Sequence, residues 1–377
     1  MIRPTVLPPI AITLALLGLA PQAAIATPSL ESLQQQIAAL TAEVEAQRAA
    51  SSGTAADTGK TTLGGYGEHH YNNLDSKNEV DAHRFVLFVG HRFDEDIRFF
   101  SELEVEHGLV KDTDDGSGPG EVELEQAFVE VRINDALRVT AGQFLVPVGF
   151  LNETHEPDTF YGVERNPVES AIFPTTWWET GAMVSGAFGD ALGYDLALHS
   201  GLNNSTGNVR SGRQKSAKAK ANEWAATARI KYHPRNDLEL AIAVQQQADM
   251  AQRAAAAPQE ATLLNAQFVW QPLAKLQVRG LYGQWDIDNL APADAARAEQ
   301  NGFYVETAYR ITPEIGLFAR YNQWDNKAAD SVDSEAAQTD VGVNWWLHPQ
   351  VVVKADYQQQ SKTVDVDGFN LGLGWSF

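Results

Sequence analysis

The sequence contains no cysteine, and basic residues are scarce beside acidic ones, with 28 Lys and Arg against 49 Asp and Glu in 377 residues. The lack of cysteine excludes a disulfide scaffold and a thiolate site. The formal net charge of −21 argues against a nucleic-acid partner, for which a basic face is expected. Glycine, aromatic residues and regular spacing must therefore explain the fold.

The N-terminus has the parts of an export signal. An apolar run from Ile10 to Ala20 follows Arg3 and precedes a small-residue cleavage site at 24–26. These features predict a secretory signal peptide at residues 1–26. The run is too short for a membrane-spanning helix, so we expect the mature protein to be exported.

Residues 27–48 are expected to form a periplasmic helix. Its apolar positions recur at alternating steps of three and four, as in the a/d seam of a coiled coil. The seam consists of Leu30, Leu33, Ile37, Leu40, Val44 and Gln47. Fewer than three heptads make an isolated helix marginal, so a lone amphipathic helix and a small coiled coil on an oligomer axis both remain open. Residues 49–60, rich in Ala, Ser, Gly and Thr, indicate a flexible linker.

From residue 61 to residue 377 the apolar residues follow a period of two, which is typical of β-strands. The last strand shows it most clearly, because Leu371, Leu373 and Trp375 alternate with Gly372 and Gly374. Short turns and long polar connections, the first at 72–79, also alternate along the chain. This pattern predicts an all-β, antiparallel transmembrane barrel of about sixteen strands, with short periplasmic turns and long outer loops.

The third long connection is irregular from 151 to 176, between a strand at 138–149 and a strand that restarts at Trp177. A connection this long and aperiodic, with Pro157, Pro167 and Pro174, is expected to be a functional loop. We predict that it folds inward and narrows a pore.

Several segments resemble the phosphate-selective porin O and P family of Gram-negative outer membranes. They are AGQF (141–144), VPVGF (146–150), FYGVERNP (160–167) and WWE (177–179). The resemblance covers 141–182 well and the rest of 61–377 loosely. It implies a homotrimer, a third loop in the lumen, and uptake of small anions. A coiled coil before the barrel is similar to a subset of these trimeric channels.

Strand parity assigns charged residues to a water-filled lumen, where charge costs little. Acidic residues on two early strands should face basic residues on the opposite wall, across an eyelet with a transverse field. The alternative interpretation is that these side chains are solvated or form internal ion pairs that hold the loop in place. The predicted wall residues are Glu102, Glu104, Glu125, Arg279, Arg310, Arg320 and Lys354. The predicted constriction-loop residues are Glu153, His155, Glu156, Asp158, Glu164, Arg165 and Glu169.

A basic cluster in the fourth loop is expected at the mouth of the channel, where it could concentrate anions by electrostatic steering. It consists of Arg210, Arg213, Lys215, Lys218 and Lys220. The alternative interpretation is a loop that contacts lipopolysaccharide phosphates or a neighbouring subunit.

Histidines on neighbouring strands do not predict a metal site, because strand alternation is expected to separate them between the two faces. The set is His69, His70, His83, His91 and His107. Ser200 and His199 are adjacent on a strand, so they cannot form the pair that a barrel phospholipase needs. We therefore expect no enzymatic activity, no cofactor and no metal.

These observations predict a homotrimeric outer-membrane porin that passes small hydrophilic solutes by passive diffusion, with anions such as phosphate preferred. Its partners would be those solutes, outer-membrane lipid and lipopolysaccharide. A general or weakly cation-preferring porin is the first alternative, because the chain and its third loop are acidic. A structural envelope protein, with a barrel closed by its own loop and a coiled coil reaching toward peptidoglycan, is the second.

Overall fold

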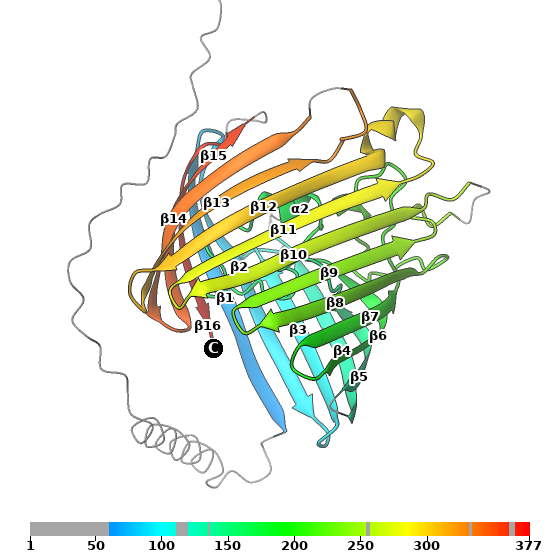
Figure 1. Cartoon of the computed structure of the whole chain (residues 1–377), viewed down its shortest axis with the longest axis horizontal. Coiled ribbons are helices and arrows are strands. Elements are labelled where there is room, and N and C mark those ends of the chain that lie inside the picture. The colour runs from blue at the N-terminus through cyan, green and yellow to red at the C-terminus, as the bar shows by residue number, and fades with distance from the viewer. Residues whose placement is uncertain (1–59, 111–119, 135, 254–256, 332–333, 362–365) are drawn as a thin grey trace, which may run out of the picture. The chain divides into compact units, whose positions relative to one another are not determined.

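The computed structural model describes residues 60–110, 120–134, 136–253, 257–331, 334–361 and 366–377. Sixteen antiparallel strands form one closed barrel, in which each strand pairs with its sequence neighbours and β1 pairs with β16 (Figure 1). This confirms the predicted fold class and strand number. The strands are β1 Thr61–Leu74, β2 Lys77–Arg92, β3 Ile97–Glu106, β4 Val122–Asn134, β5 Leu137–Leu145, β6 Trp178–Phe188, β7 Leu192–His199, β8 Ala225–Arg235, β9 Leu238–Gln247, β10 Ala261–Leu273, β11 Leu276–Ile287, β12 Glu299–Arg310, β13 Ile315–Asp325, β14 Ala336–His348, β15 Val351–Ser361 and β16 Gly368–Ser376.

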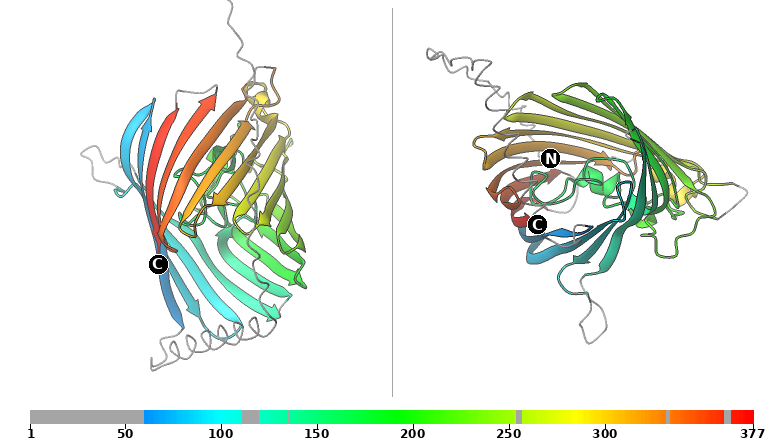
Figure 2. Two further views of the ribbon diagram at one scale, coloured as in Figure 1. Left: turned by 60° about the vertical axis from the view of Figure 1, so that its left-hand side comes forward. Right: turned by 90° about the horizontal axis from the view of Figure 1, so that it is seen from below.

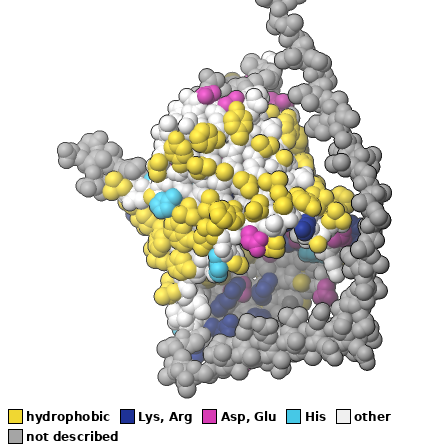
Figure 3. Space-filling view, turned by 90° about the vertical axis from the view of Figure 1, so that its left-hand side faces the viewer, with side chains coloured by type: hydrophobic (Ala, Val, Ile, Leu, Met, Phe, Trp, Pro, Cys, Tyr) yellow, Lys and Arg dark blue, Asp and Glu magenta, His cyan; other side chains and the backbone are white. Residues whose placement is uncertain are grey.

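The alternation of side chains follows from the pleat of each strand, which points successive residues to opposite faces. On β16, Leu371 and Leu373 are 45% and 41% exposed. Asn370, which lies between Phe369 and Leu371 in the chain, is fully buried. Apolar side chains cover much of the outer face of the barrel that Figure 3 shows. The outside of the barrel is therefore apolar, as contact with lipid requires.

Residues 1–59 lie outside the described part of the chain. The predicted signal peptide, the predicted helix and nearly all of the predicted linker fall there. Within the described part, no helix has the length and apolar character needed to cross a membrane.

The first connection differs from the expected long loop at 72–79. β1 continues to Leu74 and β2 begins at Lys77, and Asn72 pairs with Glu79 across the hairpin. Polar residues at a rim need not leave the ladder, because strand ends that extend beyond the hydrocarbon are hydrated on both faces. The polarity of this segment marked the rim of the barrel and not the end of the strands.

The third loop, here L3 (residues 146–177), lies inside the barrel (Figure 2). β5 ends at Leu145, four residues before the expected strand end, because Pro147 has no N–H for the ladder. L3 contains a short helix, α2 Pro167–Ala171, and Asn166 caps it by accepting a hydrogen bond from the Glu169 N–H. The two ends of L3 are joined through the Asn152 amide, which donates to the carbonyls of Val146 and Trp177. The predicted inward fold of this loop is confirmed.

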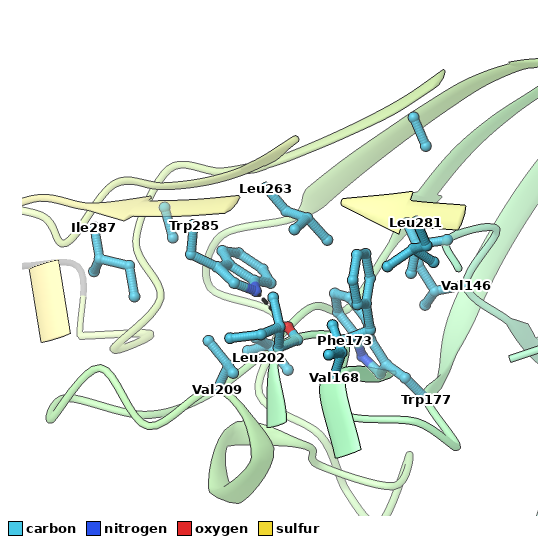
Figure 4. Close-up of a cluster of buried hydrophobic side chains, with 14 of the residues drawn as sticks. Val146, Val168, Phe173, Trp177, Leu202, Val209, Leu263, Leu281, Trp285 and Ile287 are labelled. Carbon is cyan, nitrogen blue, oxygen red and sulfur yellow. Dashed lines mark hydrogen bonds between the residues drawn. The ribbon is translucent and has the colours of Figure 1, made fainter. Parts of the chain in front are cut away.

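An apolar cluster holds L3 against the wall made by β10, β11 and β12 (Figure 4). Phe173 of L3 and Trp285 of β11 are fully buried, and Trp285 Nε1 donates to the Ile172 carbonyl at 2.7 Å. The loop can approach the wall this closely because Gly283, which faces Phe173, has no side chain. A Cβ on Gly283 would lie 2.2 Å from the Phe173 ring, which is far inside van der Waals contact.

The division between outer and inner faces predicts the effect of a charged substitution. Val305, on the outer face of β12, is 42% exposed. Val305→Arg should lower the free energy of unfolding in lipid by about 2–4 kcal/mol, because arginine would enter hydrocarbon. The matched control is Gln277→Arg, whose side chain lines an inner cavity, and it should change this free energy by less than about 1 kcal/mol. Urea unfolding in vesicles measures both, and equal effects would contradict this assignment of faces.

Candidate functional site

The wall formed by β11 to β15 carries the basic residues that were expected to face the lumen. Arg279, Arg320 and Lys354 do point inward, but they are only 8%, 3% and 2% exposed. Arg279 Nε lies 2.8 Å from Glu306 Oε1, and Arg320 Nε lies 3.0 Å from Asp340 Oδ2. These ion pairs form within one wall. The expected opposition of this wall to the acidic strands across open water is therefore not what the structure shows.

The same residues hold the backbone of L3. Lys354 Nζ donates to the Gly162 carbonyl at 2.8 Å, and Arg320 Nη1 donates to the Tyr161 carbonyl at 3.3 Å. The amide N–H of Val163 donates to Asp356 at 2.6 Å. Because hydrogen bonds to charged groups are roughly twice as strong as neutral ones, this wall fixes the depth of L3 in the barrel.

The opposite side of L3 meets β1, β3, β4 and β8 through acidic and imidazole groups. His155 Nε2 lies 3.3 Å from Glu102 Oε1 and 3.6 Å from Glu125 Oε2. Glu164 accepts hydrogen bonds from the Asn72 amide and the His70 imidazole, at 2.9 and 3.1 Å. Burial favours the neutral form of Glu164. The hydrogen bond from His70 and the positive charge of that imidazole nevertheless lower the pKa of Glu164.

Glu153 is the third anchor on this side. It forms ion pairs with Arg229 and Lys231 of β8, and Arg229 also pairs with Asp195 of β7. Glu156 is half-buried within L3, where its carbonyl accepts a hydrogen bond from the Thr159 hydroxyl. The predicted loop carboxylates thus act mainly as contacts between L3 and the wall.

Glu169 of α2 organises the entry of L3. Its Oε2 accepts from the N–H groups of Phe150 and Leu151 at 2.9 and 2.7 Å, and its Oε1 accepts from the Tyr304 hydroxyl at 3.0 Å. Burial raises the pKa of Glu169, and these hydrogen bonds oppose that shift. The side chain is fully buried, and it joins the start of the loop to β12.

A cavity of about 330 Å³ lies between L3, the fourth loop and the strands β1 to β4. One side is acidic, with Glu106 and Glu121 beside Glu123 and Glu125. The other side is basic and comes from the loops, with Arg165 of L3 and the residues Arg210, Arg213 and Lys215 of the fourth loop. Charges of both signs thus line this cavity, and its basic groups come from the loops and from Arg84 of β2, not from β11 to β15.

The cavity arginines bond chiefly to backbone oxygens. Arg210 Nη1 donates to the Thr175 carbonyl at 3.0 Å, and Arg213 Nη1 donates to the Thr176 carbonyl at 2.7 Å. Arg165 Nη1 donates to the Thr176 hydroxyl at 2.8 Å, and its Nε and Nη2 have no hydrogen-bond partner in the described part of the chain. Burial and repulsion by Arg213 and Arg165 lower the pKa of Arg210 to about 10, so it remains charged at neutral pH.

The lysines of the predicted mouth cluster behave differently. Lys215 forms ion pairs with Glu121 and Glu123, and these carboxylates raise its pKa despite burial. Lys218 and Lys220 are exposed. The five residues therefore divide into two cavity arginines, one paired lysine and two lysines in solution.

A second cavity of about 260 Å³ lies near the short-turn end of the barrel. Asp158 and Tyr161 of L3 line it together with Arg310. The Arg310 guanidinium stacks over the Trp346 ring at 3.5 Å, and Asp158 Oδ2 accepts from the Ser376 hydroxyl at 2.8 Å. L3 thus separates a larger charged cavity from a smaller one at the opposite end.

Arg84 and Glu68 were not among the predicted site residues, but they lie inward on β2 and β1 and form an ion pair at 2.8 Å. The outward Phe85 and Leu87 of β2 give the parity that would have found Arg84. Glu125 was expected inside, but strict alternation from the outward Ala127 would have placed it outside. A bulge between Glu102 and Leu103, where Glu125 has no partner residue, brings it into the interior.

The expectation that alternation separates the histidines is wrong for three of them. The rings of His70 and His83 stack at 4.3 Å, and Asp81 Oδ2 lies 2.9 Å from His83 Nδ1 and 2.8 Å from His107 Nδ1. All three imidazoles line the larger cavity. By contrast, His69 packs on Trp375 of the neighbouring strand β16.

A closed barrel with an apolar outside, a charged interior and a loop folded into the lumen defines an outer-membrane channel. A family profile described as Gram-negative porin matches residues 38–365. The chain belongs to the Gram-negative porin family. Family and fold together imply a channel rather than an enzyme.

Three individual proteins illustrate the similarity. An uncharacterized protein of Aquifex aeolicus (strain VF5) is 28% identical over 362 residues, covering 84% of this chain and 80% of that protein. The anion-selective porin from Comamonas acidovorans has a TM-score of 0.58 at 13% identity, covering 84% of this chain and 99% of that one. The trimer form of OmpT, an outer membrane protein of Vibrio cholerae, has a TM-score of 0.56 at 10% identity, with coverages of 84% and 99%. The two solved structures show the fold shared by these chains.

Removing the carboxylate that organises L3 should widen the channel. Glu169→Ala leaves the buried N–H groups of Phe150 and Leu151 without acceptors, which costs about 1–3 kcal/mol for each group. We expect a larger and noisier single-channel conductance in a planar bilayer. Glu314→Ala, in the short turn after β12, is the control and should leave the conductance unchanged. Identical traces for the two variants would contradict the role given to Glu169.

Proposed function

We propose that this outer-membrane porin is a passive diffusion channel for small hydrophilic solutes that prefers anions such as phosphate. One observation carries the proposal. Arg165, Arg210 and Arg213 meet in the larger cavity, and among the described residues none of them forms an ion pair with a carboxylate. Guanidinium groups with free donors are well suited to phosphate and carboxylate oxygens.

The position of these arginines supports selection during passage. They project from L3 and from the fourth loop into the cavity between these loops and β1 to β4, so a solute in this cavity meets all three. Backbone carbonyls of Thr175 and Thr176 orient two of the guanidinium groups, which limits the entropy lost when an anion binds. Such a site attracts an anion but leaves it free to move on, as conduction requires.

A weakly cation-preferring porin is the second candidate, and the acidic side of the cavity favours it. Glu106 lines this side without an ion pair in the described residues. Lys215 pairs with Glu121 and Glu123 and offsets one of their two charges, whereas the three arginines form no ion pair in the described residues.

We further propose that the protein is exported through the signal peptide at 1–26 and assembles as a homotrimer, with residues 27–48 as a coiled coil. The support is the heptad seam of the sequence, together with the trimer form of the structurally similar OmpT. Lipopolysaccharide phosphates are proposed contacts for the exposed Lys218 and Lys220 at the outer rim.

The sign of ion selectivity tests the proposal. In a planar bilayer with a KCl gradient, the wild-type reversal potential should have the anion-selective sign, and millimolar phosphate should reduce the KCl current. The variant Arg165→Gln with Arg210→Gln and Arg213→Gln should lose both properties, because it removes the unpaired positive charge.

The matched control is Lys218→Gln with Lys220→Gln, which removes charge from exposed positions of the same loop. It should retain both properties. A cation-selective wild type without phosphate block would support the second candidate, while a complete absence of channels would support a barrel closed by its own loop.

Assembly has a separate test. Ile37→Asp with Leu40→Asp places charge in the proposed seam and should lower the temperature at which the trimer dissociates in detergent. Gln35→Asp with Gln36→Asp, outside the seam, is the control. Heat-modifiable trimers that are equally stable in both variants would leave the helix with no part in assembly.

A further inference from the structure

Four side chains are buried together where L3 meets the wall of β3 and β4. They are Glu102, Glu104, Glu125 and His155, and they are 1%, 0%, 2% and 2% exposed. Arg84 lies 3.3 Å from Glu104 Oε1, but it also pairs with Glu68. Three carboxylates thus share one histidine and part of one arginine. Buried charge of this kind needs further compensation, because water is not there to supply it.

The hydrogen bonding of the group is incomplete. In the part of the chain that the structure describes, Glu125 Oε2, both carboxylate oxygens of Glu104 and His155 Nδ1 have no hydrogen-bond partner. Buried polar atoms without partners are rare in native proteins, and a bound ion is one accepted explanation. The unpartnered polar atoms therefore point to a bound ligand, and this observation is independent of the acidity of the group.

The distances between the group's atoms suit a metal ion. Glu102 Oε1, Glu125 Oε2 and His155 Nε2 lie within 4.8 Å of one another, with the imidazole nitrogen 3.3 and 3.6 Å from the two oxygens. Ligands about 2.1 Å from a tetrahedral zinc ion are separated by about 3.4 Å. Glu102 Oε2 accepts a hydrogen bond from the Gln126 amide at 2.6 Å, which is the kind of contact that orients a metal-binding carboxylate.

From this geometry we propose that Glu102, Glu125 and His155 bind a divalent transition-metal ion such as Zn²⁺. Two carboxylates and one imidazole form a mixed ligand set that zinc accepts. Glu125 also lines the larger cavity, which gives the ion a path from solution and leaves a coordination position for water. Because His155 belongs to L3 and the carboxylates belong to β3 and β4, the ion would join the constriction loop to the wall.

The neighbouring group of Asp81, His83 and His107 fits a metal less well. Its contacts of 2.8 and 2.9 Å have hydrogen-bond lengths, and the second ring nitrogen of His83 lies 2.8 Å from Arg84 Nη2. Binding a metal through His83 Nδ1 would require a proton on that second nitrogen, where it would face the guanidinium donor. This group therefore serves as an internal control.

The experiment is a calorimetric titration of the chelator-treated, full-length mature protein in detergent with Zn²⁺ alone. We expect one Zn²⁺ per chain and a rise in melting temperature, since an ion that binds the folded state stabilises it. Glu125→Gln preserves the shape of the side chain and removes one ligand, and His155→Gln removes another. Each should weaken binding by more than about tenfold.

Two matched histidine variants identify the site. His107→Gln alters the neighbouring group and His69→Gln alters the outer face, and both should bind Zn²⁺ as the wild type does. Loss of binding in His107→Gln but not in Glu125→Gln would overturn the proposal. A wild type that binds no stoichiometric Zn²⁺ would overturn it as well and would indicate that Glu104 and Glu125 share a proton instead. Either result leaves the anion selectivity of the channel to be decided by the reversal potential.

Discussion

Hydrocarbon offers no hydrogen bonds to a peptide group, and the architecture of this protein follows from that constraint. A sheet exposed to lipid must leave no edge, so β1 pairs with β16 and the barrel closes. Closure with sixteen strands leaves an interior too wide for wall side chains to fill. A segment of the chain must occupy that space if the channel is to select its solutes, and L3 does so.

The position of L3 depends on three different kinds of contact. Toward β10 to β12 it packs apolar side chains such as Phe173 onto glycine, and toward β13 to β15 charged groups such as Lys354 hold its carbonyls. Toward β3 and β4 it offers His155 to a surplus of carboxylates. The side toward β3 and β4 is short of positive charge, and this shortage supports the proposed ion.

Much of the fold could be predicted because the strand period is local. The alternation of Leu371 and Leu373 with Gly372 and Gly374 indicates the face of β16 without knowledge of any neighbour. Parity also placed Arg279, Arg320 and Lys354 inside correctly. Strict alternation does not account for Glu125, which lies inside as expected but through a bulge. The polar segment at 72–79 did not form the expected long loop, because its residues pair across the β1–β2 hairpin.

The sequence by itself determined the barrel, the approximate number of strands and the identity of the inward loop, since each depends on periodicity and on segment length. Only the tertiary structure decided which charges meet. Parity assigns a side chain to a face but not to a height or a partner, so it could not show that Glu306 pairs with Arg279. Nor could it show that Arg165 and Arg210, far apart in the chain, share one cavity, because the fold of two loops brings them together.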